Sequence, residues 1–254
     1  MRRLKIVTVK IVTALAVVAG ILLNAPARAA DNVDLLLVLA ADVSRSIDAA
    51  KFQLQRDGYA AAISDPRVLE TIKSGHLGRV GLTFVEWSGV GAQHVVIDWT
   101  MVGDGASAKD FGDRLLEAPR SFADRTSISG AIDFAMDRFS HAPFASTRRV
   151  IDISGDGTNN AGRDVSSARD DAVGQGVTIN GLVILSENPM SWNPDHTNPP
   201  GGLDNYYRNN VVGGTGAFVM VAKDFNSFGQ ALIGKLIAEV AENRLPKQAH
   251  LAAR

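Results

Sequence analysis

The chain of 254 residues contains no cysteine, so disulfide bonds cannot stabilise it and an N-terminal lipid-modified cysteine is excluded. It also lacks clustered Lys and Arg beyond residue 29, and therefore has no basic surface of the kind that binds nucleic acid. Three motifs are missing as well: G-x-G-x-x-G after the first predicted strand, G-x-x-x-x-G-K-[ST], and a serine nucleophile elbow with a nearby histidine. Dinucleotide binding, P-loop nucleotide binding and serine hydrolysis are therefore not expected.

Residues 1–29 have the composition of a secretory signal peptide. Basic residues precede an apolar run over residues 11–23, and Ala27-Arg28-Ala29 places small residues at the cleavage positions. A membrane-spanning helix needs about 20 apolar residues, so an uncleaved anchor is the less favoured alternative. Without residues 1–29 the chain holds 21 Lys and Arg against 27 Asp and Glu, a net charge of −6. We expect a periplasmic or secreted protein that does not insert into a membrane after cleavage.

Six apolar runs alternate with stretches of helical periodicity after residue 30. The first run is apolar throughout, as in a strand of a parallel sheet that is covered on both faces. A short Gly-containing connection between the second and third runs predicts a hairpin. The predicted strands are 33–40, 79–87, 94–99, 149–154, 177–185 and 217–221, and the predicted helices are 47–63, 107–116, 129–139, 164–174 and 225–241. This order predicts an α/β fold with a doubly wound, mostly parallel six-stranded sheet and one antiparallel edge strand.

One long segment interrupts this alternation. Residues 188–214, rich in Pro, Asn and Gly, separate the last two predicted strands. Long insertions in compact domains are usually functional or disordered, and this one follows the carboxyl end of a strand, where open α/β sheets bind ligands. Both a loop that flanks a site and an inert surface loop fit the pattern. We predict one domain over residues 31–243 and a flexible tail over residues 244–254.

Oxygen-bearing side chains follow two of the strands and precede one helix. The alternation Asp42-x-Ser44-x-Ser46 lets one short loop turn three such side chains toward a common point just beyond the first strand. Thr126 precedes a predicted helix, and Asp156 follows the fourth strand, which in a doubly wound sheet can lie beside the first. Carboxylates and hydroxyls are hard ligands, so a set without Cys or His favours Mg²⁺, Mn²⁺ or Ca²⁺ over zinc or copper. Taken singly, each of these residues is explained as well by helix capping or turn formation.

The three segments resemble the metal-ion-dependent adhesion site (MIDAS) of the von Willebrand factor A (vWA) domain family, and the element order over residues 33–241 is similar to that family's fold. The ligand roles then fall to Asp42, Ser44, Ser46, Thr126 and Asp156, some directly and some through water. In the family, a Glu or Asp of the bound protein completes the coordination. The chain also resembles exported bacterial vWA-like proteins, whose function the resemblance does not supply. The resemblance implies a protein-binding module with Mg²⁺ (or Mn²⁺ or Ca²⁺) as cofactor and no enzymatic activity.

The sequence departs from the family pattern at the last ligand. The family usually places its Asp directly after a Thr or Ser, whereas Gly155 stands between Ser154 and Asp156 here. Asp152 is the competing carboxylate, but it lies within the strand. We expect Asp152 to be buried and paired with a neighbour such as Arg149, because an unpaired buried charge is costly. Asp156 is favoured because it lies beyond the strand end.

Two other functions remain open. A metal-dependent hydrolase would need further groups near the ion. The candidates are Glu86, Asp195, His196 and Asp204. Glu86 or His196 in the same cavity as Asp42 would favour this alternative, although we expect the five histidines of the chain at the surface or in turns. A haloacid-dehalogenase-like phosphatase needs a second carboxylate two residues after its first, where this chain has Ser44. In a metal-free scaffold, Asp42→Ala would change neither partner binding nor the thermal response to magnesium.

Overall fold

The computed structural model describes residues 30–185 and 193–241, and the account below concerns the unit that begins at Asp31. The signal peptide and the tail predicted for residues 1–29 and 244–254 lie outside the described residues, as does the beginning of the long segment 188–214. Within the described ranges, no helix combines the length and apolar character needed to cross a bilayer.

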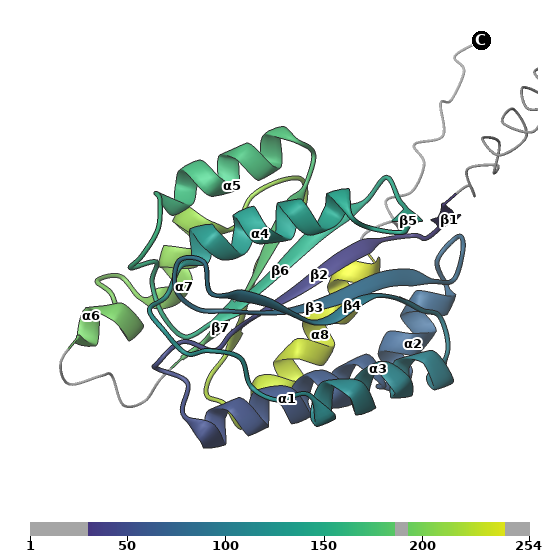
Figure 1. Ribbon diagram of the computed structural model, residues 1–254, viewed down its shortest axis with the longest axis horizontal. Helices are drawn as coiled ribbons and strands as arrows, with labels where there is room; N and C mark the ends of the chain where they lie inside the picture. The colour runs from purple at the N-terminus through teal and green to yellow at the C-terminus, as the bar shows by residue number, and fades with distance from the viewer. Residues whose placement is uncertain (1–29, 186–192, 242–254) are drawn as a thin grey trace, which may run out of the picture. The chain divides into compact units, whose positions relative to one another are not determined.

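A six-stranded sheet lies between two layers of helices (Figure 1). Its strands are β2 (Leu36–Asp42), β3 (Val80–Trp87), β4 (Gln93–Val102), β6 (Arg149–Gly155), β7 (Thr178–Ile184) and β8 (Val219–Ala222). The spatial order is β4-β3-β2-β6-β7-β8, and every adjacent pair is parallel except β3 and β4. The predicted fold class, including the antiparallel edge strand, is confirmed. A separate parallel pair, β1 (Asp31–Asn32) with β5 (Phe144–Ala145), was not predicted.

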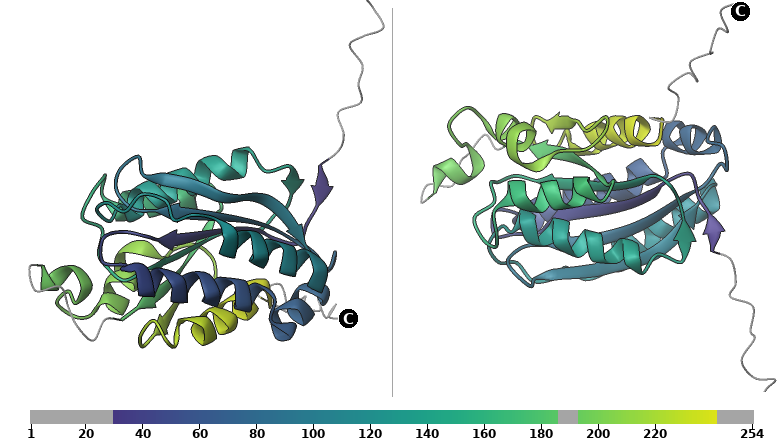
Figure 2. Two further views of the ribbon diagram at one scale, coloured as in Figure 1. Left: turned by 60° about the horizontal axis from the view of Figure 1, so that its bottom comes forward. Right: turned by 90° about the horizontal axis from the view of Figure 1, so that it is seen from above.

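Helices cover both faces of the sheet (Figures 1 and 2). On one face lie α4 (Ile128–Ser140) and α5 (Val165–Gly174). On the other lie α1 (Ala49–Ile63), α2 (Pro66–Lys73), α3 (Gly105–Glu117) and α8 (Phe228–Ala241). Each face has its own apolar core, and every residue of β2 and β3 is buried. Because helices cover both faces of the sheet, β2 is apolar along nearly its whole length.

Helix starts follow local capping. Asp48, not Ser46, caps α1, because its side chain accepts a hydrogen bond of 2.9 Å from the backbone N–H of Lys51. Ser46 is therefore free of the capping role that offered the simplest alternative to a ligand role.

The predicted long loop is partly helical where it is described. It contains α6 (Pro194–Thr197), α7 (Leu203–Tyr206) and a π-helix over Tyr207–Val211.

Asp152 is buried, as expected, but its predicted pairing with Arg149 is wrong. Its Oδ1 lies 2.6 Å from the ammonium nitrogen of Lys235 on α8, which also contacts Glu239, and all three side chains are completely buried. Residues three apart on a strand point to opposite faces, so Asp152 faces α8 whereas Arg149 faces the other layer. Arg149 instead donates a hydrogen bond to the backbone carbonyl of Gln175.

Candidate metal site

The carboxyl ends of β2 and β6 lie side by side at one edge of the sheet. The two strands are parallel neighbours, with Ala41 opposite Ser154 in the register. Asp42 is the last residue of β2, and Asp156 follows the last residue of β6, so both carboxylates lie at this edge of the sheet. This edge is where open α/β sheets place ligand sites.

Four of the five predicted site residues form one chain of hydrogen bonds. The Oδ1 atom of Asp42 accepts from the backbone N–H of Ser44 at 2.7 Å. The hydroxyl oxygens of Ser44 and Ser46 are 3.1 Å apart, and the hydroxyl of Ser46 donates to Asp156 Oδ1 at 2.5 Å. The loop after β2 thus connects the two carboxylates through the backbone N–H and hydroxyl of Ser44 and the hydroxyl of Ser46.

Thr126, the fifth residue, lies in the wall of the same pocket as Ser46. The pocket has a volume of about 360 Å³, and His196 also lines it. The loop after β6 holds Thr126 in place, since Asn160 accepts from its backbone N–H at 3.0 Å and donates its own backbone N–H to the Thr126 carbonyl at 2.9 Å. The structure therefore brings all five predicted residues to one edge of the sheet.

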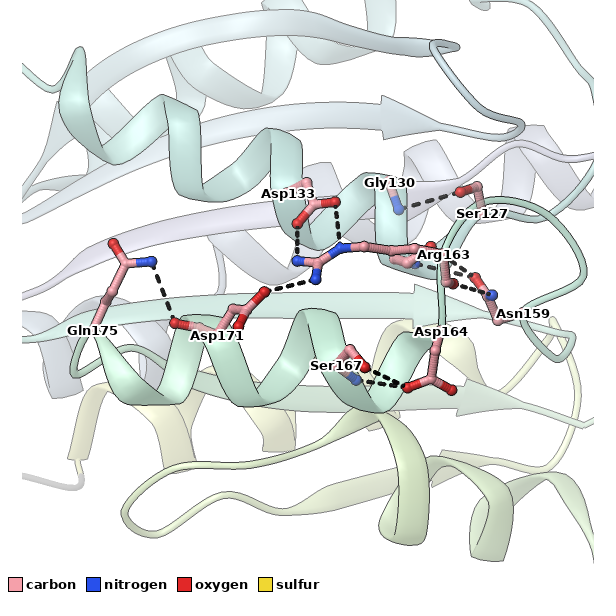
Figure 3. Close-up of polar contacts among 10 residues, drawn as sticks. Ser127, Gly130, Asp133, Asn159, Arg163, Asp164, Ser167, Asp171 and Gln175 are labelled. Atoms are coloured by element: carbon pink, nitrogen blue, oxygen red, sulfur yellow. Dashed lines mark hydrogen bonds and ion pairs between the residues drawn. The ribbon is translucent and has the colours of Figure 1, made fainter.

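The loop after β6 is itself fastened to the helices above it (Figure 3). Asn159 accepts from the backbone N–H of Ser129 at 3.1 Å, at the start of α4. Arg163 donates to Asp133 on α4 and to Asp171 on α5, each at 2.6 Å. These contacts fix the loop that follows Asp156 relative to the helix that follows Thr126.

Gly155 explains the departure from the family pattern. A Cβ atom at this position would lie 2.6 Å from the Tyr207 hydroxyl and 3.1 Å from Asp42 Oδ2. Tyr207 comes from the π-helix and is completely buried. A Thr or Ser at position 155 would therefore collide with the tyrosine that this chain places beneath the site.

Two buried carboxylates dominate the electrostatics. Burial, together with the charge of Asp156, raises the pKa of Asp42 to about 8, and burial also raises the pKa of Asp156. Asp42 Oδ2 and Asp156 Oδ2 are both buried without a hydrogen-bond partner among the described residues. The nearest cation to Asp156 Oδ2 is the Lys51 ammonium, 3.6 Å away. Two buried carboxylates that repel each other and present free oxygens have the chemistry that suits a divalent cation.

Carboxylates alone do not complete such a site. No group of three or more His, Cys, Asp or Glu side chains in the described part of the chain has a metal-binding arrangement. An ion bound here would depend on hydroxyl oxygens as well. The residues that fit this requirement are Ser44, Ser46 and Thr126.

His196 corrects one prediction. The histidines were expected at the surface or in turns, but His196 on α6 is only 4% exposed. Its Nε2 lies 3.1 Å from Thr126 Oγ1, and burial lowers its pKa. Its ring packs on Gly157, where any Cβ would collide with the imidazole. No periodicity in the Pro- and Gly-rich segment around His196 indicates this position.

The other three residues considered for hydrolysis do not line the pocket. Glu86 is completely buried and forms an ion pair with Arg56 at 2.5 Å, while its second oxygen accepts from the backbone N–H of Ser121 at 2.8 Å. Asp204 forms an ion pair with Arg208, and Asp195 is exposed. Only His196, among the four, reaches the site.

Arg120, in the connection between α3 and α4, was not recognised from the sequence. Its guanidinium donates to the backbone carbonyls of Val43 at 2.9 Å and Ile47 at 2.7 Å, and lies 5.1 Å from the centre of the Phe52 ring. It therefore holds both ends of the loop that carries Ser44 and Ser46. A single basic residue far away in sequence gives no local signal of such a contact.

A family model described as "Protein of unknown function (DUF1194)" matches residues 32–244. No curated protein matches the chain significantly. Among solved structures, a von Willebrand factor type A protein from Catenulispora acidiphila is 14% identical with a TM-score of 0.56, over 82% of this chain and 43% of that one. Proximal thread matrix protein 1 from the mussel byssus, with a zinc-occupied MIDAS motif, is 13% identical with a TM-score of 0.55, over 84% and 47%.

The protein BatB from Bacteroides thetaiotaomicron is 18% identical with a TM-score of 0.52, over 82% of this chain and 99% of that one. The chain thus spans less than half the length of the first two structures and almost the whole of the third. At these identities the likeness shows the fold. The chain belongs to the DUF1194 family, and its fold is that of a vWA domain.

Proposed function

We propose that this protein is an exported, metal-ion-dependent protein-binding module. Its ion would be Mg²⁺, or Mn²⁺ or Ca²⁺, and its partner a protein that presents an Asp or Glu side chain. It would act in the periplasm or outside the cell. The residues proposed to hold the ion are Asp42, Ser44, Ser46, Thr126 and Asp156.

One observation carries this proposal: the hydrogen-bonded chain from Asp42 through the two serines to Asp156, which ends in two buried carboxylate oxygens without partners. Burying two like charges so close together is unfavourable, and the Lys51 ammonium, 3.6 Å from Asp156 Oδ2, supplies only one compensating charge. When bound, the ion supplies the remaining positive charge and a coordination position for a carboxylate oxygen of the partner. Asp42 and Asp156 supply the negative charge that the ion balances. The serine hydroxyls lie in the loop that connects these two carboxylates.

The structural relatives give this proposal a context. One of them, the mussel matrix protein, has a MIDAS motif occupied by zinc. A protein of similar fold therefore holds a divalent ion at a motif of the kind that the sequence of this chain resembles. The net charge of −6 for the chain without residues 1–29 adds no electrostatic attraction for nucleic acid, which supports a protein partner.

The experiment that tests the proposal is selection of peptides by the immobilised full chain. A random peptide library is bound in Mg²⁺ and eluted with a chelator. We expect the eluted peptides to contain an Asp or Glu whose replacement by Ala abolishes binding. The matched control is Asp156→Asn, which keeps the shape of the side chain and removes one charge, and we expect it to retain no peptide in either condition.

Retention that is equal in Mg²⁺ and in chelator, or that survives Asp156→Asn, would contradict a metal-dependent mechanism. Binding of peptides without any acidic residue would contradict the partner chemistry.

One observation favours a second candidate, a metal-dependent hydrolase: His196 lines the same pocket as Ser46 and Thr126. Glu86, the other residue considered for this role, is occupied by Arg56 and lies outside the pocket. Turnover of a phosphate or carboxylate ester that requires both a divalent ion and His196 would establish this candidate in place of the binding module.

A further inference from the structure

Lys51, in the first turn of α1, places a positive charge beside the candidate metal site. Its ammonium nitrogen lies 3.6 Å from Asp156 Oδ2, a buried carboxylate oxygen without a hydrogen-bond partner. The Lys51 side chain is only 27% exposed, and its charge opposes the rise in the pKa of Asp156 that burial causes. Among the described residues, no other side chain forms an ion pair with Asp42 or Asp156.

Contacts other than the one with Asp156 hold the ammonium in place. It donates a hydrogen bond of 2.8 Å to the backbone carbonyl of Ser46. It also lies 5.2 Å from the centre of the Phe225 ring, where the face of an aromatic ring attracts a cation. The Lys51 backbone is fixed as well, because Asp48 caps the helix at its N–H. The positive charge is therefore anchored beside the site independently of the carboxylate.

The other cations near the site differ from Lys51. The charge of Arg120 acts on Asp42, but its guanidinium is bonded to backbone carbonyls of the loop after β2. Arg45 and Arg125 line the pocket, yet both are exposed, and water weakens the interactions of exposed charges. Lys51 is the cation whose charge the site meets at close range and with little screening.

Formal charges indicate what Lys51 does to an occupied site. The carboxylates of Asp42 and Asp156 together balance one divalent ion, so the nearby ammonium leaves one positive charge in excess. Charges a few ångströms apart interact strongly where water has little access. The excess positive charge therefore disfavours the ion and favours a further carboxylate, which restores neutrality.

We infer that Lys51 sets the balance between the two ligands of the proposed site: it weakens the binding of a divalent ion alone and strengthens the binding of a partner carboxylate to the ion-loaded site. The inference rests on the proposed function and adds to it the residue that makes the loaded site positive. A neutral residue at position 51 would leave a site that holds its ion more tightly and attracts an acidic side chain less.

The first measurement is the affinity for Mn²⁺ by isothermal titration calorimetry of the full chain. We expect Lys51→Gln to bind Mn²⁺ at least about tenfold more tightly, because the repulsion between ammonium and ion disappears. Lys51→Arg keeps the charge and should bind Mn²⁺ like the unsubstituted chain. If Lys51 served only to hold the Ser46 carbonyl, its loss would loosen the loop and weaken binding instead.

Lys109→Gln is the matched control. It removes the same charge from an exposed ion pair with Asp113 on α3, and we expect it to leave Mn²⁺ affinity unchanged. Circular dichroism and thermal unfolding check that all three variants fold. An affinity for Mn²⁺ that is unchanged or weaker in folded Lys51→Gln would overturn the inference.

The second measurement uses acetate as the simplest carboxylate ligand. The Mn²⁺ titrations are repeated at one subsaturating acetate concentration, and the gain in Mn²⁺ affinity that acetate causes is compared between variants. We expect a larger gain in the unsubstituted chain and in Lys51→Arg than in Lys51→Gln, because the ammonium attracts the bound acetate. An equal or larger gain in Lys51→Gln would contradict the role of Lys51 in carboxylate binding.

The role of Lys51 and the proposed metal site fail in different ways. Mn²⁺ that binds the unsubstituted chain and Lys51→Gln equally would overturn the role of Lys51 and leave the metal site intact. If Mn²⁺ binds neither of them, or if Asp42→Asn and Asp156→Asn leave Mn²⁺ binding unchanged, the proposed metal site fails as well.

Discussion

Two carboxylates, Asp42 and Asp156, concentrate negative charge in a buried place. Neither has a solvent-exposed side chain, and one oxygen of each has no hydrogen-bond partner. The raised pKa of Asp42 expresses the same unfavourable energy in terms of proton binding. Bringing these two carboxylates together therefore lowers the stability of the ion-free protein. A substitution that removes one charge separates the stability of the ion-free protein from its stabilisation by ions.

We predict that Asp42→Asn stabilises the chain in chelator. The amide oxygen still accepts from the Ser44 N–H, and the repulsion with Asp156 disappears. The charged form of Asp42 is disfavoured by burial and by Asp156, so we expect the free energy of unfolding at pH 9 to increase by at least about 1.4 kcal/mol, the equivalent of one unit of its raised pKa. Chemical denaturation measures it, and the same variant should lose the stabilisation that divalent ions give to the unsubstituted chain.

Asp57→Asn provides the control for this change. Asp57 is exposed on α1 and accepts from Gln53, which an asparagine oxygen can also do. It should unfold like the unsubstituted chain with and without ions. An Asp42→Asn variant that is less stable in chelator, or that is still stabilised by ions, would contradict the charge argument.

At the scale of an element, the loop between β2 and α1 depends on a residue outside it. Arg120 binds the carbonyls of Val43 and Ile47, at the two ends of that loop. One guanidinium nitrogen, Nη2, donates to both, and the guanidinium lies over the Phe52 ring. The serine hydroxyls between these carbonyls are positioned through this contact.

We predict that Arg120→Ala lowers the affinity for Mn²⁺ by about tenfold while the chain remains folded, because residues that orient ligands typically contribute 10–100-fold. Isothermal titration calorimetry measures the affinity. Arg114→Ala, which removes an exposed ion pair with Asp110 on α3, is the control and should bind Mn²⁺ normally. Unchanged affinity in a folded Arg120→Ala chain would show that the loop holds its shape without this arginine.

The elements that were predictable are those with a strong local pattern. Apolar runs located the six main strands, and the short connection after β3 predicted the antiparallel hairpin. The short α2 was missed although Asp65-Pro66 is a start signal, because eight residues show little periodicity.

The candidate site likewise contains residues whose positions could be predicted from the sequence and residues whose positions could not. Asp42 ends a strand, and Ser44, Ser46 and Asp156 follow strand ends, so the topology of a parallel sheet was enough to predict that they meet. His196 and Tyr207 come from a Pro- and Gly-rich segment whose path is set by tertiary contacts, with Thr158 and Gly155 among them. Nothing in the local sequence specifies those contacts.

At the scale of the whole molecule, a buried charge cluster joins the sheet to its last helix. Lys235 lies between Asp152 and Glu239, and the Asn180 side chain donates to Glu239 at 2.9 Å. One ammonium cannot neutralise two carboxylates. Burial, with the Lys235 charge opposing it and the Glu239 charge adding to it, raises the pKa of Asp152 to about 7.

We predict that this cluster makes the stability of the chain depend on pH. A carboxyl whose pKa rises on folding binds its proton more tightly in the folded state, so stability falls as the pH rises from about 4 to about 7. Asp152→Asn should make that decrease shallower, by up to about 1.4 kcal/mol per pH unit for the loss of one titrating group. Urea denaturation in chelator across this range measures it, and an unchanged slope in Asp152→Asn would show that Asp152 does not titrate there.

Lys235 also affects the order in which the chain can close. The ribosome makes Asp152 long before it makes α8, so a growing polypeptide contains the anion of the central sheet without its cation. Because Asp152 faces α8, its carboxylate stays open to water until that helix packs on the sheet. The helix that buries the anion therefore brings its cation in the same step, so the chain never has to enclose a lone carboxylate, which would cost several kcal/mol.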